Sequence, residues 1–225
     1  MKLLIDDARI DQIRRICDLY PIDGVTTNPT ILARAGGRPY DTLRAIRSFL
    51  GPEADLHVQV ISRDAAGILA EARQIGAVLG ANTFVKIPVL PEGLKAMELL
   101  RRENRPFTAT AIYTPMQAFL AGKRGAAFAA PYVNRIDNMG FDGVQVAKDI
   151  HDIYRNNGMT TQVVAASFKN SQQLLELCKY GLDAATAAPD IIEALVKNPA
   201  IDAAVEAFIA DFEGLTGPGV TMADC

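Results

Sequence analysis

The sequence predicts an α/β fold, a single (β/α)8 barrel with an extra C-terminal helix. Short apolar runs alternate eight times with longer amphipathic stretches along 225 residues. Most of the apolar runs also carry a polar side chain near their C-terminal end. Eight βα units of this length are typical of a closed parallel barrel. The alternative is a doubly wound open sheet, which usually has fewer strands and often a glycine-rich phosphate loop.

The predicted strands are apolar or β-branched runs bounded by polar and turn-forming residues. They span residues 2–7, 24–28, 56–61, 83–89, 107–112, 129–135, 162–168 and 183–188. Side chains along a strand alternate between two faces, so in a barrel one set points to the helices and the other to the interior. The interior set carries polar residues near the strand ends, namely Asp6, Asn28, Gln59, Lys86, Thr110 and Ser167. Each alone is better explained as a hydrogen-bonded core residue, but together they predict one site.

The helix-like stretches between the strands include residues 64–79, 92–103, 143–156 and 171–179. Asp64 and Ser171 are expected to be N-caps, and Gly181 lies just past a helix end. A terminal helix over 202–212 places Val205 and Phe208 on one apolar face. Residues 214–225 are expected to form a flexible tail. The whole chain, residues 1–225, is therefore predicted to be one barrel domain with this helix and tail.

Composition excludes several classes of protein. The chain is 49% hydrophobic and 22% charged, which is enough to bury one large core. Its net charge is −3, and the basic residues are scattered among acids, so no nucleic acid partner is expected. No apolar run is long enough to cross a bilayer, so a membrane partner is not expected either. The expected partners are small molecules and further copies of the chain.

Cysteine and histidine usage gives two further expectations. Cys17, Cys178 and Cys225 are widely spaced and odd in number, and the chain opens with a strand pattern and no secretory leader, which predicts a cytoplasmic, reduced protein. The two histidines, His57 and His151, have no partner at ligand spacing, so no metal site is expected.

Lys86 is the most informative residue, because it interrupts an apolar strand. An unpaired ammonium group at a buried position costs several kcal/mol, so this amine is expected to lose its proton more easily than a surface lysine. A neutral buried amine is a nucleophile. The alternative is a lysine near the strand end whose amine reaches water.

A neutral lysine inside a barrel can attack a ketone or aldehyde and form an iminium. The iminium then accepts electrons from the adjacent carbon–carbon bond, which is aldol chemistry. The groups available to move protons are Asp6, Gln59, Thr110 and Tyr132. Arg135, Ser167 and Lys169 lie near strand ends and could bind a phosphate, although such residues are often only solvated.

Four separated motifs carry a family resemblance. They are Gly-Val-Thr-Thr-Asn-Pro-Thr at 24–30, Phe-Val-Lys-Ile-Pro at 84–88, Ala-Pro-Tyr-Val-Asn-Arg-Ile-Asp at 130–137 and Ala-Ala-Ser-Phe-Lys-Asn at 165–170. In this order they resemble the transaldolase family, most closely its short branch, which includes fructose-6-phosphate aldolase. The resemblance implies a (β/α)8 barrel, a sugar-phosphate substrate, no metal or nucleotide cofactor, and a homo-oligomer, a pentamer or decamer.

The resemblance also implies roles for individual residues. Lys86 would form the Schiff base, and Asp6 would act as the acid/base. Thr26 and Asn28 would bind substrate hydroxyls. The phosphate would be held by Arg135 and Ser167, with Lys169 behind them.

Three positions depart from the transaldolase pattern toward the aldolase branch. Gln59 stands where transaldolases have Glu, Tyr132 where they have Phe, and Asn134 where they have Gly. Gln59, Thr110 and Tyr132 could together hold a water that protonates the enamine and releases free dihydroxyacetone. We therefore expect reversible cleavage of a ketose phosphate such as fructose 6-phosphate into dihydroxyacetone and glyceraldehyde 3-phosphate.

Other functions are also compatible with the sequence. A transaldolase would pass the dihydroxyacetone unit to another sugar phosphate. A barrel that only binds sugar phosphates would not need Lys86 or Asp6, and a metal-dependent aldolase or isomerase would lose activity to a chelator. Two further departures bear on the site. Ala130 replaces a phosphate-binding serine, which predicts a wider acceptor range, and Asp7 follows Asp6 but should point outward by strand alternation.

Overall fold

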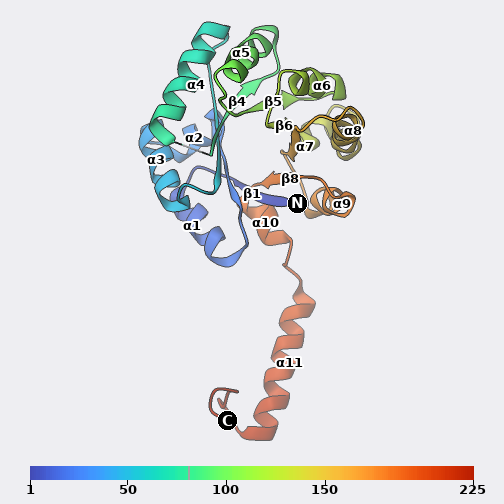
Figure 1. Cartoon of the computed structure of the whole chain (residues 1–225). Coiled ribbons are helices and arrows are strands. Elements are labelled where there is room, and N and C mark those ends of the chain that lie inside the picture. Colours follow the sequence, from blue (N-terminus) through green and yellow to red (C-terminus); the bar gives the residue numbers. More distant parts are fainter. Residues whose placement is uncertain (81) are drawn as a thin grey trace. The chain divides into compact units, whose positions relative to one another are not determined.

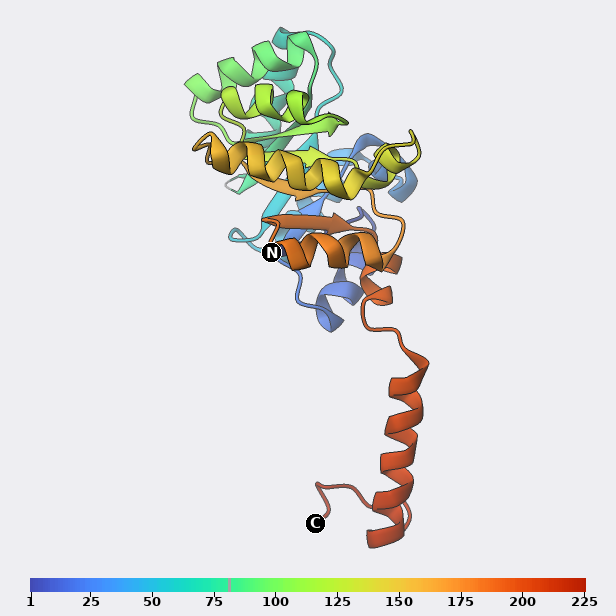
Figure 2. The ribbon, with the colours of Figure 1, turned by 90° about the vertical axis from the view of Figure 1, so that its right-hand side faces the viewer.

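A computed structural model describes residues 1–80 and 82–225. Eight parallel strands close into a barrel in the order β1 to β8, with β8 paired to β1. Helices surround these strands (Figure 1), and the view in Figure 2 shows α8 and α9 running along them. The predicted (β/α)8 barrel is therefore confirmed.

The strands start where the sequence pattern predicts, to within one residue. They are β1 Lys2–Asp6, β2 Gly24–Thr26, β3 Asp55–Gln59, β4 Thr83–Pro88, β5 Phe107–Ile112, β6 Phe128–Pro131, β7 Gln162–Ala165 and β8 Ala184–Ala187. The predicted C-terminal ends are mostly too long. The largest error is at β6, which ends at Pro131 because a short helix, α7, begins at Val133. Arg135 is thus on a helix and not on strand six as predicted.

The first helices, α1 to α6, are Ile10–Leu19, Pro29–Ala35, Pro39–Leu50, Ala65–Leu79, Pro91–Arg102 and Pro115–Lys123. They are followed by α7 Val133–Asp137, α8 Gly143–Asn156, α9 Ser171–Tyr180, α10 Pro189–Ala194 and α11 Pro199–Thr216. Asp64 caps α4 as predicted, and Gly181 ends α9 in the left-handed conformation. The cap of α9 is Asn170 and not Ser171, because the Asn170 side chain accepts the Gln173 N–H while Ser171 is already helical.

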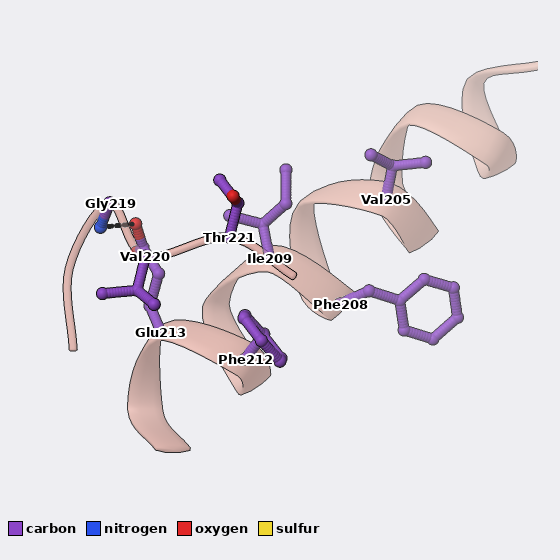
Figure 3. Close-up of a pocket in the computed structure, with 8 residues that line it drawn as sticks. All are labelled: Val205, Phe208, Ile209, Phe212, Glu213, Gly219, Val220 and Thr221. Carbon is purple, nitrogen blue, oxygen red and sulfur yellow. Dashed lines mark hydrogen bonds between the residues drawn. The ribbon is translucent and has the colours of Figure 1, made fainter. Parts of the chain in front are cut away.

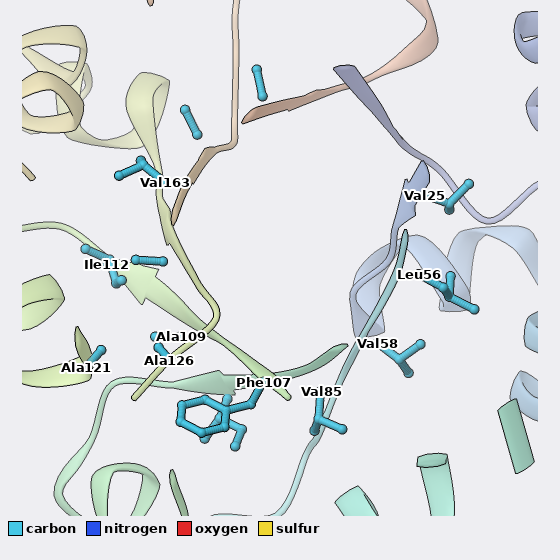
Figure 4. Close-up of a cluster of buried hydrophobic side chains, with 14 of the residues drawn as sticks. Val25, Leu56, Val58, Val85, Phe107, Ala109, Ile112, Ala121, Ala126 and Val163 are labelled. Atoms are coloured by element: carbon cyan, nitrogen blue, oxygen red, sulfur yellow. The ribbon is translucent and has the colours of Figure 1, made fainter. Parts of the chain in front are cut away.

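Two clusters of apolar side chains fill the barrel domain. The larger lies between the strands and the helices, where Val25, Leu56, Val58 and Val85 point away from the barrel axis (Figure 4). The smaller lies inside the barrel and consists of Leu4, Phe128, Ala130, Val164 and Ala184, with Phe84 against them. This inner cluster forms an apolar floor, and the polar strand-end residues follow it along the strands.

The chain divides into two compact units, Met1–Ile192 and Glu193–Cys225. In the second unit α11 is longer than predicted, because the first residues assigned to the tail are helical. The rest of the tail turns back on this helix, and the Gly219 N–H donates to the Glu213 carboxylate at 2.9 Å. Helix and tail line a pocket of about 500 Å³ whose walls include Phe208, Phe212 and Val220 (Figure 3).

No helix in the described part of the chain combines the length and apolarity that a membrane crossing requires.

Candidate active site

Lys86 lies inside the barrel on β4. Its neighbours on this strand, Val85 and Ile87, belong to the outer core, so strand alternation turns Lys86 inward. Only 4% of the residue is exposed. Its Nζ atom donates a hydrogen bond to the backbone carbonyl of Thr27 at 3.0 Å. The amine is therefore held below the surface by a neutral acceptor, as the apolar strand context predicts.

Asp6 ends β1 and belongs to a chain of hydrogen bonds. The Thr26 hydroxyl donates to the Asp6 carboxylate at 2.7 Å and lies 2.6 Å from the hydroxyl of Thr186. Closure of the barrel brings these residues together from β1, β2 and β8. The sequence reasoning did not single out Thr186, although it is a polar residue near the end of the last strand.

Burial drives both ionisable groups of this site toward their neutral forms. It lowers the pKa of Lys86, with Asp6 opposing and Arg135 adding to that shift. It also raises the pKa of Asp6, with Lys86 and the Thr26 hydroxyl opposing. An amine with a lowered pKa is a stronger candidate nucleophile at neutral pH, and a carboxyl with a raised pKa can exchange protons there.

Asp7 has hydrogen-bond partners of its own outside this pair, although its charge adds to the raised pKa of Asp6. Its carboxylate accepts hydrogen bonds from the backbone N–H groups of Ala8 and Arg9 at 2.7 and 2.8 Å and forms an ion pair with the Arg9 guanidinium. Burial opposes its ionisation, but the hydrogen bonds from Arg9 and Ala8 leave its pKa lowered. This arrangement agrees with the outward direction expected from strand alternation.

A second group of polar side chains comes from β3, β5 and the residue after β6. The hydroxyls of Thr110 and Tyr132 lie 2.9 Å apart. The Gln59 side-chain oxygen is buried and has no hydrogen-bond partner among the described residues. Gln59 also lines a cavity of about 500 Å³ that extends between α2, α3 and α4. The Thr110 and Tyr132 hydroxyls are thus in contact, and the Gln59 oxygen can accept a hydrogen bond.

The predicted phosphate-binding residues follow β6 and β7, with Arg135 on helix α7 and Ser167 and Lys169 on the loop before α9. The Arg135 guanidinium is exposed and stacks over the Tyr132 ring, 4.5 Å from its centroid. The Asn134 N–H donates to the Ser167 carbonyl at 2.7 Å and joins the two loops. Ser167 has a φ of +64°, which is unusual for a residue other than glycine. Lys169 follows it and is exposed.

Asn28 has a structural role as a helix cap in addition to its predicted role in substrate binding. Its side-chain oxygen caps α2 by accepting the Ile31 N–H at 3.0 Å. This leaves the amide nitrogen as the group that can donate to a substrate hydroxyl.

His57 is a fully buried histidine inside the barrel. Its ring stacks on Phe84 at a centroid distance of 4.9 Å, and its Nδ1 lies 2.8 Å from the Thr108 hydroxyl. Burial, with Lys86 and Lys2 nearby, holds the His57 pKa well below its usual value, so the ring is neutral. Within residues 1–80 and 82–225, no group of three or more His, Cys, Asp or Glu side chains is arranged so that it could hold a metal ion.

Comparison with solved structures shows the fold alone. A mandelate racemase/muconate lactonizing enzyme-like protein from Rubrobacter xylanophilus is 17% identical, with a TM-score of 0.59 over 80% of this chain and 49% of that chain. A mutant flavocytochrome b2 with pyruvate bound is 10% identical, with a TM-score of 0.63 over 85% of this chain and 58% of the other. The chain thus spans about half the length of these structures.

Comparison of sequences is more specific. A protein of Hydrogenobaculum sp. described as a probable transaldolase is 38% identical over 214 residues, which are 95% of this chain and 97% of that protein. The family model described as transaldolase/fructose-6-phosphate aldolase matches residues 3–222. This chain belongs to the transaldolase/fructose-6-phosphate aldolase family.

Proposed function

We propose that this protein is a class I aldolase that reversibly cleaves a ketose phosphate such as fructose 6-phosphate. The products would be dihydroxyacetone and glyceraldehyde 3-phosphate. The observation that carries the proposal is the buried amine of Lys86, whose pKa is lowered by burial inside the barrel. Such an amine can form a Schiff base with a ketone.

In the proposed reaction the Lys86 nitrogen attacks the substrate carbonyl carbon. The carbonyl oxygen takes a proton, and the carbinolamine then loses water to give an iminium. Asp6 is the proposed acid/base. Its raised pKa supports this role, and so does its electrostatic interaction with Lys86. Thr26 would help to orient Asp6 through their hydrogen bond.

Cleavage then breaks the C3–C4 bond, which joins the carbon next to the iminium carbon to the carbon that bears the C4 hydroxyl. The electron pair of that bond moves into the iminium and gives an enamine, while the C4 hydroxyl loses its proton and becomes the aldehyde. A water held by Gln59, Thr110 and Tyr132 would protonate the enamine carbon. Hydrolysis of the new iminium would release dihydroxyacetone and restore Lys86. The Thr110–Tyr132 hydroxyl pair and the unpartnered Gln59 oxygen support this assignment.

Arg135, Ser167 and Lys169 are the proposed phosphate handle, and Asn28 would donate to a substrate hydroxyl. The two loops that carry the handle are joined by the hydrogen bond from Asn134 to Ser167. Ala130 belongs to the apolar floor of the barrel, where it offers no hydroxyl to a phosphate. The proposed handle is therefore formed by residues of the two segments that follow β6 and β7.

The second candidate is a transaldolase, which the printed name of the Hydrogenobaculum relative favours. It would share every step up to the enamine. The enamine would then attack a second aldehyde instead of taking a proton. The two reactions differ only in whether a proton donor reaches the enamine first.

Two experiments test the proposal. Incubation with dihydroxyacetone and borohydride, followed by peptide mapping, should place the reduced adduct on Lys86; an adduct elsewhere or none would contradict Schiff-base chemistry at this residue. Fructose 6-phosphate should then be cleaved without added erythrose 4-phosphate. Turnover that requires the added aldehyde would favour the transaldolase.

A further inference from the structure

The last residue of α7 joins three elements of the barrel domain. One oxygen of the Asp137 carboxylate accepts the backbone N–H of Gly143, at the start of α8, at 2.7 Å. The other oxygen accepts a hydrogen bond from the side-chain amide of Gln173 on α9. Both contacts are part-buried. Asp137 therefore ties the loop after β6 to the two helices that follow it.

The other end of the Gln173 side chain holds the loop after β7. Its oxygen accepts the backbone N–H of Lys169 at 2.7 Å. A continuous path thus runs from the α7 loop through Asp137 and Gln173 to Lys169. We call Asp137 and Gln173 the carboxamide clamp.

The carboxamide clamp is close in sequence to the proposed phosphate handle. Asp137 is two positions after Arg135, and Lys169 is two positions after Ser167. The two loops are also joined by backbone hydrogen bonds from Val133 to Ala166 at 2.9 Å and from Asn134 to Ser167 at 2.7 Å. The clamp is a second, side-chain connection between the same loops, and the pair of connections sets the separation of the loops.

A fixed separation matters because the handle consists of groups from two segments of the chain, of which Arg135 and Lys169 are exposed and Ser167 is partly buried. A phosphate bound by groups on both loops requires them at one spacing, and displacements near 1 Å can cost about 100-fold in rate. The left-handed backbone of Ser167 is costly for a serine and is retained only where the surroundings hold it.

We propose that Asp137 and Gln173 are positioning residues for the phosphate of the substrate. The inference rests on the proposed function. The clamp acts by setting the distance between Arg135 on one loop and Ser167 with Lys169 on the other, and it does not touch the reacting carbons. Its effect is therefore confined to phosphorylated substrates.

The test exchanges the two clamp groups. Gln173→Glu places two carboxylates against each other and opens the clamp. Adding Asp137→Asn restores every hydrogen bond, because the new amide at position 137 donates to the new carboxylate and still accepts from Gly143, while the carboxylate accepts from Lys169. Gln172→Glu is the matched control, because it also replaces an amide that donates to a carboxylate, that of Glu176 at 3.1 Å, but on the exposed side of α9 outside the clamp.

Initial rates are measured with dihydroxyacetone and either glyceraldehyde 3-phosphate or glyceraldehyde as acceptor. Gln173→Glu should raise KM for the phosphorylated aldehyde by about 10-fold, and the double variant should recover most of that loss. The values of kcat/KM for glyceraldehyde should stay within about twofold in all variants. Equal losses for both acceptors, no loss in Gln173→Glu, or no recovery in the double variant would overturn the proposal.

A failure of the proposed aldolase function can be distinguished from a failure of the clamp proposal. If the unaltered protein neither turns over nor forms a borohydride adduct, the aldolase assignment is wrong. The clamp is then tested by calorimetric titration with inorganic phosphate. Weaker binding in Gln173→Glu, restored in the double variant and absent in Gln172→Glu, would still support a clamped phosphate site, and unchanged binding would reject it.

Discussion

The backbone carbonyl oxygen of Thr27 accepts a hydrogen bond from the Nζ atom of Lys86 at 3.0 Å. This acceptor is itself fixed, because the Thr27 N–H and hydroxyl both donate to the carbonyl of His57 at 2.9 and 3.0 Å. A carbonyl accepts from a neutral amine as well as from an ammonium group. The contact therefore orients Lys86 without requiring it to be charged, unlike a carboxylate, which would favour the ammonium form.

The first prediction concerns the nucleophile. Lys86→Met should abolish the borohydride-trapped adduct and lower kcat/KM by at least about 1000-fold, because methionine has no nucleophilic nitrogen. Mass analysis of the trapped protein and steady-state rates check this. Lys95→Met is the control, since the Lys95 side chain is 66% exposed and pairs with Glu92 on its own helix. Substantial turnover in Lys86→Met would contradict the proposed mechanism.

The second prediction concerns the proton donor for the enamine. Tyr132→Phe removes the hydroxyl that lies 2.9 Å from Thr110. Cleavage of fructose 6-phosphate without an acceptor should fall about 100-fold, within the range of lost general acid catalysis. Transfer to erythrose 4-phosphate should fall much less, because transfer needs no proton on the enamine carbon. Equal losses in the two assays would remove Tyr132 from this role.

The third prediction concerns pH. Burial lowers the pKa of Lys86 from the usual 10.5, and only the neutral amine attacks a ketone. The rate of adduct formation with dihydroxyacetone, trapped by cyanoborohydride, should rise with pH, and the midpoint of that rise should lie below pH 10.5. Arg135→Gln should move this rise to higher pH, because Arg135 contributes to the lowered pKa of Lys86. An unmoved profile would contradict that coupling.

The fourth prediction concerns packing behind Lys86. A Cβ atom at Gly93 on α5 would lie 2.2 Å from the carbonyl oxygen of Pro88, the last residue of β4. Gly93→Ala should therefore lower the free energy of unfolding by about 1–3 kcal/mol and shift the urea midpoint accordingly.

Gly214→Ala provides the comparison for that measurement. A Cβ at Gly214 on α11 meets no described atom within 4 Å, and alanine in a helix interior is favoured over glycine by roughly 0.5–1 kcal/mol. This variant should be unchanged or slightly more stable. A loss of stability in Gly214→Ala as large as that in Gly93→Ala would show that the close approach to Pro88 is not the cause.

Much of the architecture could be read from local patterns in the chain. The period of the apolar residues gives eight strands that start within one residue of their predicted places, because alternation along a strand depends only on neighbouring residues. Helix α8 spans Gly143–Asn156 as predicted. The same alternation turns Lys86 inward, so the burial of its side chain inside the barrel could be predicted from the chain alone.

The C-terminal ends of most strands could not be predicted from these local patterns. The segment after Pro131 is apolar enough to continue β6, yet it forms helix α7 and carries Arg135 away from the sheet. Local propensity is similar for the two conformations, and contacts with the neighbouring loop select between them. The bond from Asn134 to Ser167 is one such contact.

The partners of the site residues depend on how the barrel closes. Thr186 reaches Thr26 across 160 positions of sequence, and Lys86 reaches the Thr27 carbonyl across 59. The sequence pattern says which face of a strand a side chain occupies. Only strand order and stagger around the closed ring bring particular side chains and carbonyls within hydrogen-bonding distance. Residue types and their faces thus follow from the chain itself, whereas the contacts that tune Lys86 and Asp6 arise from closure.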